Sequence, residues 1–363
     1  MSSRKNNHKN HFIIATIGPS CNTPERLLEL KNAGVGIFRV NMSHSSLEDL
    51  KKFTQIGIEN DLKIGLDTEG AQIRTVLKGK DLLEIKKGDI FRIYDHLSSD
   101  NISEVIALYP EGVLSQLDIG CLVRLDFNGA SAVIESKTSS YIECKCISSG
   151  KIGNNKGVDI LNKKISLPDF TKKDLNCFQL IKELGINDVF ISFCKSRDAV
   201  LKLKKISNTI KVTSKIESKQ SINNLHSICE VSDAILIDRG DLTREINIMD
   251  IPFAQRGIIK VANAYKTPCY VATNVFESLI SGKLPTRAEL NDVVSTLEMG
   301  AAGIVLAAET AIGNKPLLSV EIVKELIHRF RLYNDDLLFA DLERNEITDI
   351  DMKLWLNRNY QID

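Results

Sequence analysis

The sequence predicts an α/β protein: a (β/α)8 barrel, or TIM barrel, with a small β-barrel lid domain inserted after the third barrel strand. Eight short β-branched runs end in polar or glycine residues, and helix-like stretches separate most of them. One connection is much longer and contains strand patterns of its own. Strand and helix alternating eight times is typical of this barrel, in which the carboxyl ends of the strands build the active site.

The eight predicted barrel strands are bounded by turn and helix signals. They cover residues 11–18, 36–43, 61–68, 188–193, 211–217, 234–241, 269–274 and 303–309. Thr23 and Pro24 open a helix over residues 24–33, and Gly34 ends it. Another helix begins at residues 285–287. The polar end of each strand is therefore a candidate for the site.

The connection between the third and fourth strands predicts a separate β-domain. Residues 82–165 contain short alternating strands broken by glycines, and a structureless loop of this length is uncommon. A lid in this position would exclude water from the site. We expect barrel segments at residues 1–74 and 166–330, the inserted domain at 75–165 and a C-terminal helical tail at 331–363.

Composition excludes several classes of function. Lys plus Arg and Asp plus Glu each number 47, so no net positive charge attracts nucleic acid or a membrane surface. No apolar run is long enough for a signal peptide or a membrane-spanning helix, so we expect a cytoplasmic protein. The eight cysteines lack a C-x-x-C spacing, and we interpret them as reduced packing residues.

The fifth and sixth strands end in charged groups that suit a magnesium site. Lys215 and Glu217 are two residues apart, so both point into the mouth of the barrel. Asp241 adds a carboxylate one strand over, and Gly240 beside it lets backbone approach a ligand. The same spacing also suits a structural ion pair between Lys215 and Glu217, and Asp241 also suits a helix N-cap.

The second and third strands end in groups that suit phosphate and a monovalent cation. Arginine's planar fork fits phosphate oxygens, and Asn, Ser, Asp and Thr oxygens together suit a monovalent cation. Taken singly, the amide and hydroxyl residues are equally typical of turns, and the histidine of the surface. These residues are Arg39, Asn41, Ser43, His44, Asp67, Thr68 and Arg74.

Eight motifs, taken together, resemble one family. They are HFIIATIGPS, FRVNMSH, LDTEGAQIRT, SKIE, RGDL, VATN, PTRAE and AAETAIGNKP, in this order around the inserted domain. In this order and at these separations they resemble pyruvate kinase over residues 11–330. The resemblance implies a phosphotransferase that, with magnesium, transfers a phosphoryl group between phosphoenolpyruvate and ADP to give pyruvate and ATP.

The resemblance also implies roles for individual residues. Lys215 would neutralise the phosphoryl group in flight, Arg39 and Arg74 would clamp the phosphate, and Glu217 with Asp241 would hold Mg²⁺ or Mn²⁺. The implied catalytic residues are Lys215, Arg74 and Thr273, the last beside the enolate carbon. The implied substrate-binding residues are Arg39, Ser192, Lys215, Gly240, Asp241 and Thr273.

Nucleotide and potassium sites follow from the same resemblance. The implied nucleotide-binding residues are His44, Arg74, Lys156 and Asp126. The implied potassium ligands are Asn41, Ser43, Asp67 and Thr68. Phosphoryl transfer depends mainly on positioning and charge neutralisation, which agrees with this concentration of cations.

Several departures from the family pattern fall near the same site. Glu69 and Gln72 stand where Lys and Glu are usual, which leaves the potassium requirement open. Asp238 replaces a small residue before Arg239. The remaining departures are Ala71 for Pro, Thr243 with Arg244 after the Arg-Gly-Asp-Leu motif, Asn274 for Gln, and Asn128 for the second aspartate of the lid.

The family's usual C-terminal domain would follow residue 330, whereas this chain ends at residue 363. We therefore expect its sugar-phosphate regulation to be missing and the usual tetramer to be replaced by a homodimer through the barrel. Two alternatives to the expected activity stay open. The chain would act on another acceptor or 2-oxo acid in a specialised pathway outside glycolysis, or it would be a catalytically silent binding or regulatory protein.

Overall fold

A computed structural model describes residues 11–79, 81–95, 105–126 and 129–334. Two compact units divide the chain: residues 1–69 with 172–363, and residues 70–171. The first ten residues, the lid residue Asn128 and residues 335–363 of the expected tail lie outside the described residues. The expected boundaries of the inserted domain, at residues 75 and 165, stay a prediction.

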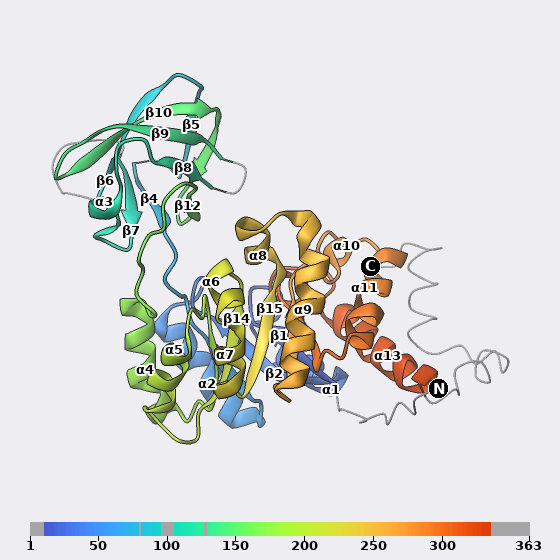
Figure 1. Cartoon of the computed structure of the whole chain (residues 1–363). Coiled ribbons are helices and arrows are strands. Elements are labelled where there is room, and N and C mark those ends of the chain that lie inside the picture. Colours follow the sequence, from blue (N-terminus) through green and yellow to red (C-terminus); the bar gives the residue numbers. More distant parts are fainter. Residues whose placement is uncertain (1–10, 80, 96–104, 127–128, 335–363) are drawn as a thin grey trace. The chain divides into compact units, whose positions relative to one another are not determined.

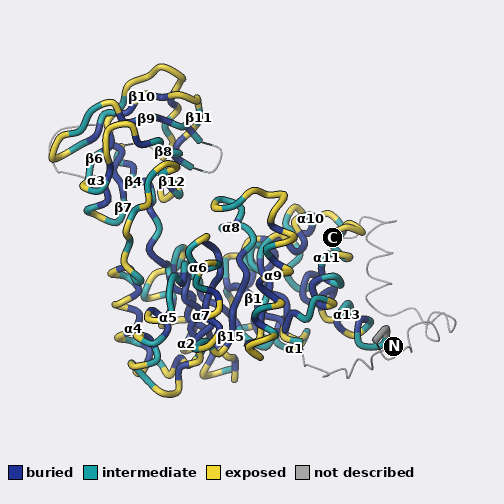
Figure 2. The backbone as a smooth tube through the Cα atoms, in the orientation of Figure 1, coloured by how far each residue is buried: buried dark blue, intermediate teal, exposed yellow. Residues whose placement is uncertain are grey.

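The first unit contains a closed parallel barrel in the order β1-β17-β16-β15-β14-β13-β3-β2. Its strands are β1 (Phe12–Thr16), β2 (Val35–Asn41), β3 (Ile64–Asp67), β13 (Asp188–Ile191), β14 (Lys211–Ile216), β15 (Ala234–Asp238), β16 (Cys269–Ala272) and β17 (Gly303–Leu306). The predicted fold class is confirmed by this barrel and the separate inserted sheet. The strands are buried and the helices around them carry the exposed residues (Figures 1 and 2).

Helices follow the barrel strands as expected. They are α1 (Pro24–Ala33), α2 (Leu47–Asn60), α4 (Lys172–Leu184), α5 (Arg197–Lys204), α6 (Lys219–Asn223), α7 (Leu225–Val231), α8 (Arg239–Glu245), η1 (Ile248–Asp250), α9 (Ile251–Ala264), α10 (Glu277–Ile280), α11 (Arg287–Glu298), α12 (Ala308–Ala311) and α13 (Pro316–Asn334). In α1 the side chain of Thr23 accepts a hydrogen bond from the backbone of Arg26. At the other end Gly34 adopts φ +125°, which few other residues tolerate. No helix within the described residues combines the length and apolarity that crossing a membrane requires.

The barrel interior is filled by apolar side chains from several strands. Ile14, Phe190, Leu236, Ala272 and Val305 form one buried cluster. Such layers make the barrel a packed core, which fixes the carboxyl ends of the strands relative to one another.

The second unit is a β-domain with its own core. A mixed sheet runs β12-β8-β9-β10-β6-β7-β4, and β11 pairs with β5. Its elements are β4 (Arg74–Lys78), β5 (Leu82–Ile85), β6 (Ile90–Tyr94), β7 (Val105–Tyr109), α3 (Val113–Gln116), β8 (Leu122–Leu125), β9 (Ser131–Lys137), β10 (Tyr141–Ser148), β11 (Gly150–Gly153) and β12 (Val158–Ile160). Residues such as Ile93, Val123, Ile134 and Ile142 form a buried cluster inside this unit.

Candidate active site

Lys215 on β14 is a buried cation at the carboxyl end of the barrel. Its Nζ donates a hydrogen bond to Oγ of Ser192 at 3.0 Å. Carboxylate oxygens of Glu217, Asp67 and Asp238 lie 3.4, 3.5 and 3.7 Å from the same nitrogen. Burial lowers the pKa of Lys215, but these three carboxylates outweigh burial and raise it above its usual value. The ammonium group therefore stays charged and is held at one position.

Glu217 lies directly after β14, and the two oxygens of its buried carboxylate have different surroundings. Its Oε1 accepts a hydrogen bond from the backbone N–H of Phe193 at 2.5 Å. Its Oε2 is buried and accepts no hydrogen bond from the residues that the structure describes. Burial is the largest cause of a raised pKa at Glu217. Lys215 acts to lower this pKa, whereas Asp241 and Asp238 act to raise it, and the resulting pKa is about 8. A carboxylate in this position is stabilised by a further cation.

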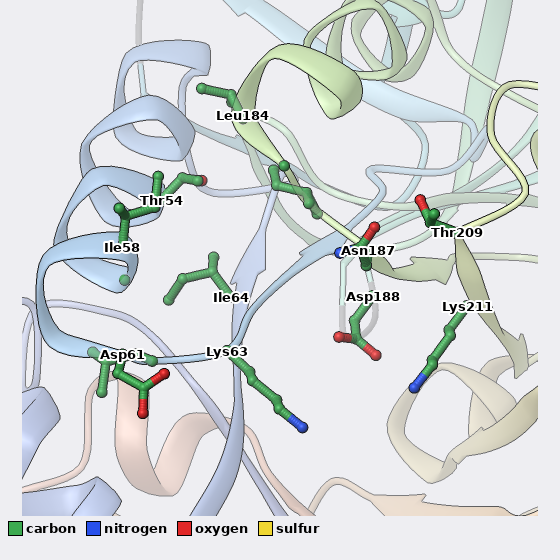
Figure 3. Close-up of a pocket in the computed structure, with 14 residues that line it drawn as sticks. Thr54, Ile58, Asp61, Lys63, Ile64, Leu184, Asn187, Asp188, Thr209 and Lys211 are labelled. Atoms are coloured by element: carbon green, nitrogen blue, oxygen red, sulfur yellow. The ribbon is translucent and has the colours of Figure 1, made fainter.

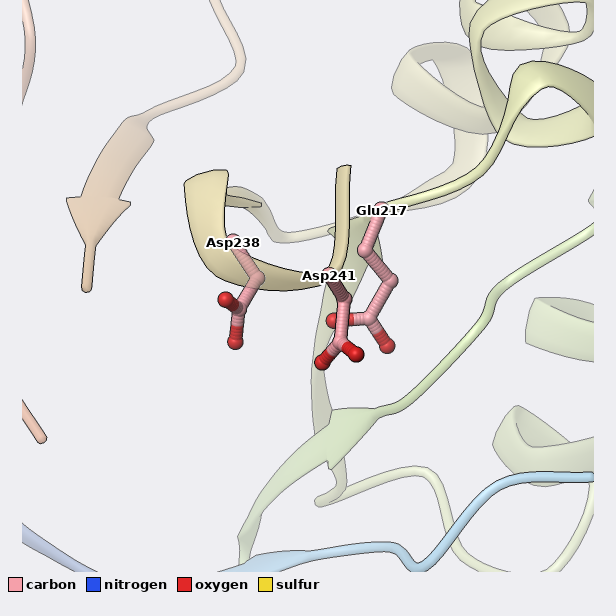
Figure 4. A group of neighbouring side chains, drawn as sticks. All are labelled: Glu217, Asp238 and Asp241. Atoms are coloured by element: carbon pink, nitrogen blue, oxygen red, sulfur yellow. The ribbon is translucent and has the colours of Figure 1, made fainter. Parts of the chain in front are cut away.

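Three carboxylates converge beside Lys215. One oxygen each of Glu217, Asp238 and Asp241 lies within 4.8 Å of the other two. Figure 4 shows the three carboxyl groups on the same side of the turn from β15 to α8. Oxygen ligands are those that magnesium prefers, and within the described residues the buried Oε2 of Glu217 accepts no hydrogen bond, with Nζ of Lys215 3.4 Å away. The donor set therefore fits a divalent cation.

The structure places a further carboxylate, that of Asp238, beside the two expected metal ligands, and it changes the setting of Asp241. Asp238, the last residue of β15, had been singled out only as a departure from the family pattern, although its place at a strand end signals a role. Asp241 lies in the first turn of α8 rather than on the predicted strand over 234–241. There it lies 3.7 Å from Nη1 of Arg244.

Thr273 follows β16 in a strained conformation. Hydrogen bonds with residues 238–240, at the end of β15 and the start of α8, stabilise it. Its φ is +70°, which is rare for a β-branched residue. Its hydroxyl donates to Oδ1 of Asp238 at 2.6 Å and accepts from the backbone N–H of Gly240 at 3.3 Å. The guanidinium of Arg239 donates to the Thr273 carbonyl at 2.7 and 3.1 Å. A Cβ at Gly240 would lie 3.0 Å from Cγ2 of Thr273, so glycine permits this close approach.

Arg39 and Asp67 connect the neighbouring strand ends to this group. Nη1 of Arg39 lies 3.2 Å from Oδ2 of Asp67, and both side chains are buried. Oδ1 of Asp67 accepts a hydrogen bond from Oγ of Ser192 at 3.2 Å. Arg39, Asp67, Ser192 and Lys215 therefore form one continuous network, which sequence reasoning had treated as separate phosphate, potassium and substrate residues.

Comparison with known proteins agrees with this arrangement. The family described as "Pyruvate kinase, barrel domain" matches residues 8–320. The chain belongs to the pyruvate kinase family. The pyruvate kinase of Thermotoga maritima is 32% identical over 331 residues, which cover 86% of this chain and 69% of the relative. The pyruvate kinase of Lactobacillus delbrueckii subsp. bulgaricus is 31% identical over 328 residues.

A solved structure shows the same fold. The crystal structure of Cryptosporidium parvum pyruvate kinase has a TM-score of 0.80 and 30% sequence identity, covering 89% of this chain and 71% of that one. The match to the Lactobacillus enzyme covers 86% of this chain and 56% of the relative. The chain thus spans little more than half the length of several curated relatives that it matches.

The expected potassium ligands of this pyruvate kinase family member lie on adjacent strands but are partly occupied. Asn41 and Asp67 are neighbours in the β2–β3 register. Oδ1 of Asn41 accepts from the backbone of Ser43 at 3.0 Å, and Oγ1 of Thr68 accepts from the backbone of Ser192 at 2.8 Å. Lys173, which sequence reasoning missed, donates to the carbonyl of Met42 at 2.5 Å. Two of the expected ligand oxygens therefore already accept backbone hydrogen bonds, and Asp67 already pairs with Arg39 and Lys215.

The nucleotide-binding candidates fall into both units of the pyruvate kinase fold. His44 belongs to the barrel unit, where its backbone N–H donates to the carbonyl of Asn41 at 3.1 Å. Arg74, Lys156 and Asp126 belong to the β-domain. There Arg74 forms an isolated bridge with Gly157, whose carbonyl accepts from the backbone of Asp126 at 2.9 Å. The segment at 155–157 therefore brings the three β-domain candidates together.

A separate hollow of about 420 Å³ lies at the opposite end of the barrel. It is lined by the amino ends of β13 and β14, and Figure 3 shows Asp188 between Lys63 and Lys211. In this fold the amino ends of the strands contribute to stability rather than to catalysis. We therefore place the active site of this family member at the carboxyl ends.

Proposed function

We propose that the chain catalyses magnesium-dependent phosphoryl transfer between phosphoenolpyruvate and ADP, giving pyruvate and ATP. The observation that carries the proposal is the buried ammonium of Lys215, which lies 3.4 Å from the possible metal ligand Glu217. A fixed positive charge of this kind stabilises charge on a phosphoryl group in transit. Membership of the pyruvate kinase family supports the same reaction.

Each barrel residue has a physical role in this reaction. Lys215 neutralises the phosphoryl group, and the guanidinium of Arg39 contributes a second positive charge for the phosphate. Ser192 positions Lys215 through their 3.0 Å hydrogen bond. Thr273 lies beside the carbon that gains a proton, and the glycine at 240 lets substrate approach the backbone. Glu217 and Asp241 would hold Mg²⁺ or Mn²⁺, which would supply neutralisation of the negative charge on the substrate.

The nucleotide-binding residues we propose are His44 in the barrel unit and Arg74, Lys156 and Asp126 in the β-domain. We also propose that K⁺ binds at Asn41, Ser43, Asp67 and Thr68. The side-chain oxygens of these residues support this proposal, while Glu69 and Gln72 make the requirement a question for measurement. The rate with K⁺ is compared with the rate in tetramethylammonium, and equal rates would remove potassium from the proposal.

The test measures pyruvate release from phosphoenolpyruvate and ADP with Mg²⁺ and K⁺. Lys215→Met should lower kcat by at least a hundredfold, because the phosphoryl charge loses its fixed partner. The matched control is Lys211→Met, on the same strand but exposed at its amino end, which should leave the rate unchanged. No ATP from the wild-type protein, or equal rates for both variants, would contradict the proposal.

A second candidate function is favoured by the additional carboxylate at the site. Asp238 lies 3.7 Å from Lys215 and accepts a hydrogen bond from Thr273, so it adds a carboxylate to the surroundings of a bound substrate. The alternative is therefore transfer to another acceptor, or a reaction of another 2-oxo acid. A screen of 2-oxo acids and nucleotides tests it, and efficient turnover confined to phosphoenolpyruvate and ADP would dismiss it.

We further propose a cytoplasmic homodimer formed through the barrel. Ile248, Met249 and Phe253 on η1 and α9 support a protein contact, because their exposed fractions are 72, 72 and 74%. Light scattering on purified protein gives the mass, and Phe253→Asp should shift a dimer toward monomer. A monomeric wild-type protein at micromolar concentration would overturn this proposal.

A further inference from the structure

We propose that Asp238 is a third carboxylate ligand of the divalent cation, so that this chain binds the cation before any substrate is present. The inference rests on the proposed function, which assigns the metal to Glu217 and Asp241. It goes further by adding a residue that stands in place of a small one in the family pattern. It also predicts a binding property that is measurable without turnover.

The spacing of the carboxylates suits one cation. The three candidate oxygens lie within 4.8 Å of one another. Magnesium binds oxygens at about 2.1 Å, so opposite ligands of an octahedral ion are about 4.2 Å apart. Side-chain movements of about half an ångström would bring the widest pair to that distance. The backbone at the ends of β14 and β15 would not need to move.

A buried atom independently indicates a missing partner. Across the described part of the chain, no group donates a hydrogen bond to the buried Oε2 of Glu217, while Oε1 accepts one from the backbone of Phe193. An unsatisfied carboxylate oxygen in the interior is costly unless a cation lies beside it. The nearest protein cation, Nζ of Lys215, lies 3.4 Å away and is shared with Ser192 and two aspartates. A metal ion among the three carboxylates would satisfy this oxygen.

Neighbouring groups hold the other two carboxylates in place. Asp238 accepts the hydroxyl of Thr273 through Oδ1, and its Oδ2 faces Lys215 at 3.7 Å, beyond hydrogen-bonding distance. Asp241 is oriented by Arg244, 3.7 Å away. Outer contacts of this kind fix metal ligands and are typical of protein metal sites. Asp238 and Asp241 thus have neighbours that orient them, and Glu217 presents the oxygen that lacks a hydrogen bond among the described residues.

The local charge explains why Asp238 would allow binding without substrate. Four carboxylates, Asp67, Glu217, Asp238 and Asp241, face three cations, Arg39, Lys215 and Arg244, in the ion pairs described above. With all four carboxylates ionised, as they would be around a bound cation, the group carries a net charge of one negative unit, whereas without Asp238 it would carry none. A net negative group attracts a divalent cation by itself. A neutral group would depend more on the negative charge of a bound phosphate.

The test is a titration of purified full-length protein with Mn²⁺, following free Mn²⁺ by electron paramagnetic resonance in buffer without phosphate, nucleotide or 2-oxo acid. We expect one site in the wild-type protein and at least tenfold weaker binding in Asp238→Asn, which keeps the size of the side chain but removes its charge. The control Asp250→Asn removes an exposed carboxylate from η1 and should change the Mn²⁺ affinity by less than twofold.

A second variant separates metal binding from the hydrogen bond to Thr273. Thr273→Val removes that bond but keeps the carboxylate, so Mn²⁺ affinity should stay within threefold of wild type. Circular dichroism checks folding, and Asp238→Ser replaces Asp238→Asn if the latter unfolds. The inference would be overturned if a folded Asp238 variant bound Mn²⁺ with an affinity within twofold of wild type. It would also be overturned if neither Asp238 variant folded and Thr273→Val lost Mn²⁺ binding.

The result is independent of the assay for the proposed reaction. Loss of Mn²⁺ binding in Asp238→Asn, together with no ATP formation by the wild-type protein, would support the third ligand and reject the reaction. Normal Mn²⁺ binding in Asp238→Asn, with weakened binding in Glu217→Gln and an active wild-type enzyme, would support the reaction and reject the third ligand. Absence of any Mn²⁺ site in the wild-type protein would reject the inference.

Discussion

Arg39 and Asp67 form a buried ion pair between β2 and β3, with Nη1 of Arg39 3.2 Å from Oδ2 of Asp67. The same guanidinium donates through Nε and Nη2 to Oγ1 of Thr16 on β1, at 3.2 and 2.9 Å. Asp67 also lies 3.5 Å from Lys215 on β14. One pair of side chains thus connects four strands at the carboxyl end of the barrel, so its loss should affect both stability and the candidate site.

Asp67→Asn should destabilise the protein by about 3 to 5 kcal/mol, because it leaves the buried guanidinium of Arg39 without its counter-charge. Urea unfolding followed by circular dichroism measures the change. Asp61→Asn is the matched control, since Asp61 pairs with Lys31 on the surface, and its loss should cost less than about 1 kcal/mol. Equal losses in the free energy of unfolding for the two variants would show that the Arg39–Asp67 pair contributes no more to stability than a surface pair.

The barrel could be predicted from the sequence because its signals are local. Buried parallel strands are short β-branched runs, and helix caps such as Thr23 and Gly34 lie next to them in the chain. The ends of strands were harder to predict. The run at 234–241 continues into α8 after Asp238, since polar residues at a barrel rim suit either a strand end or a first helical turn.

The site was predictable residue by residue but not as a network. Spacing along β14 placed Lys215 and Glu217 on one side, because that argument needs only the period of a strand. The hydrogen bond from Thr273 to Asp238 joins residues 35 positions apart, and no pattern in the chain predicts it. Tertiary contacts of this kind decide which carboxylates share a cation, and they become visible only in three dimensions.

Glu309, from the AAETAIGNKP motif, should be essential for the loop after β16. Its Oε1 accepts from the backbone of Val275 and Phe276 at 3.0 and 3.1 Å, and its Oε2 from Ala307 at 2.9 Å. Glu309→Gln turns one acceptor into a donor facing a buried N–H, and should cost about 2 to 4 kcal/mol in urea unfolding. The exposed Glu277→Gln serves as control, and a cost below about 0.5 kcal/mol for Glu309→Gln would contradict this role.

The cysteines should be almost unreactive in the folded protein. All eight are free and buried, as the sequence predicted. Burial raises the pKa of Cys144 to about 12 and that of Cys229 to about 11, so the reactive thiolate is scarce at pH 8. Ellman's reagent should label less than about one thiol in the native protein within minutes, and all eight in denaturant. Rapid labelling of several native thiols would show that these sites open readily.

Glu289 at the start of α11 should contribute stability that disappears in acid. Its carboxylate accepts from the backbone and hydroxyl of Ser278 at 2.9 and 2.7 Å, and from those of Thr286 at 2.6 and 2.9 Å. Burial acts to raise the pKa of Glu289, but these hydrogen bonds outweigh it and lower the pKa below the ordinary value of 4.5. Folding therefore favours the ionised form.

The sign of the pH dependence follows from that direction. Because the unfolded chain binds the proton more tightly, the contribution of Glu289 is fully present above pH 4.5 and is lost as the pH falls through the lower pKa of the folded state. Glu289→Ala should cost about 1 kcal/mol at pH 7, and the difference from wild type should shrink below pH 4. Urea unfolding at both pH values measures it. Glu298→Ala, exposed at the other end of α11, is the control, and a Glu289→Ala cost that grows as the pH falls would contradict the assignment.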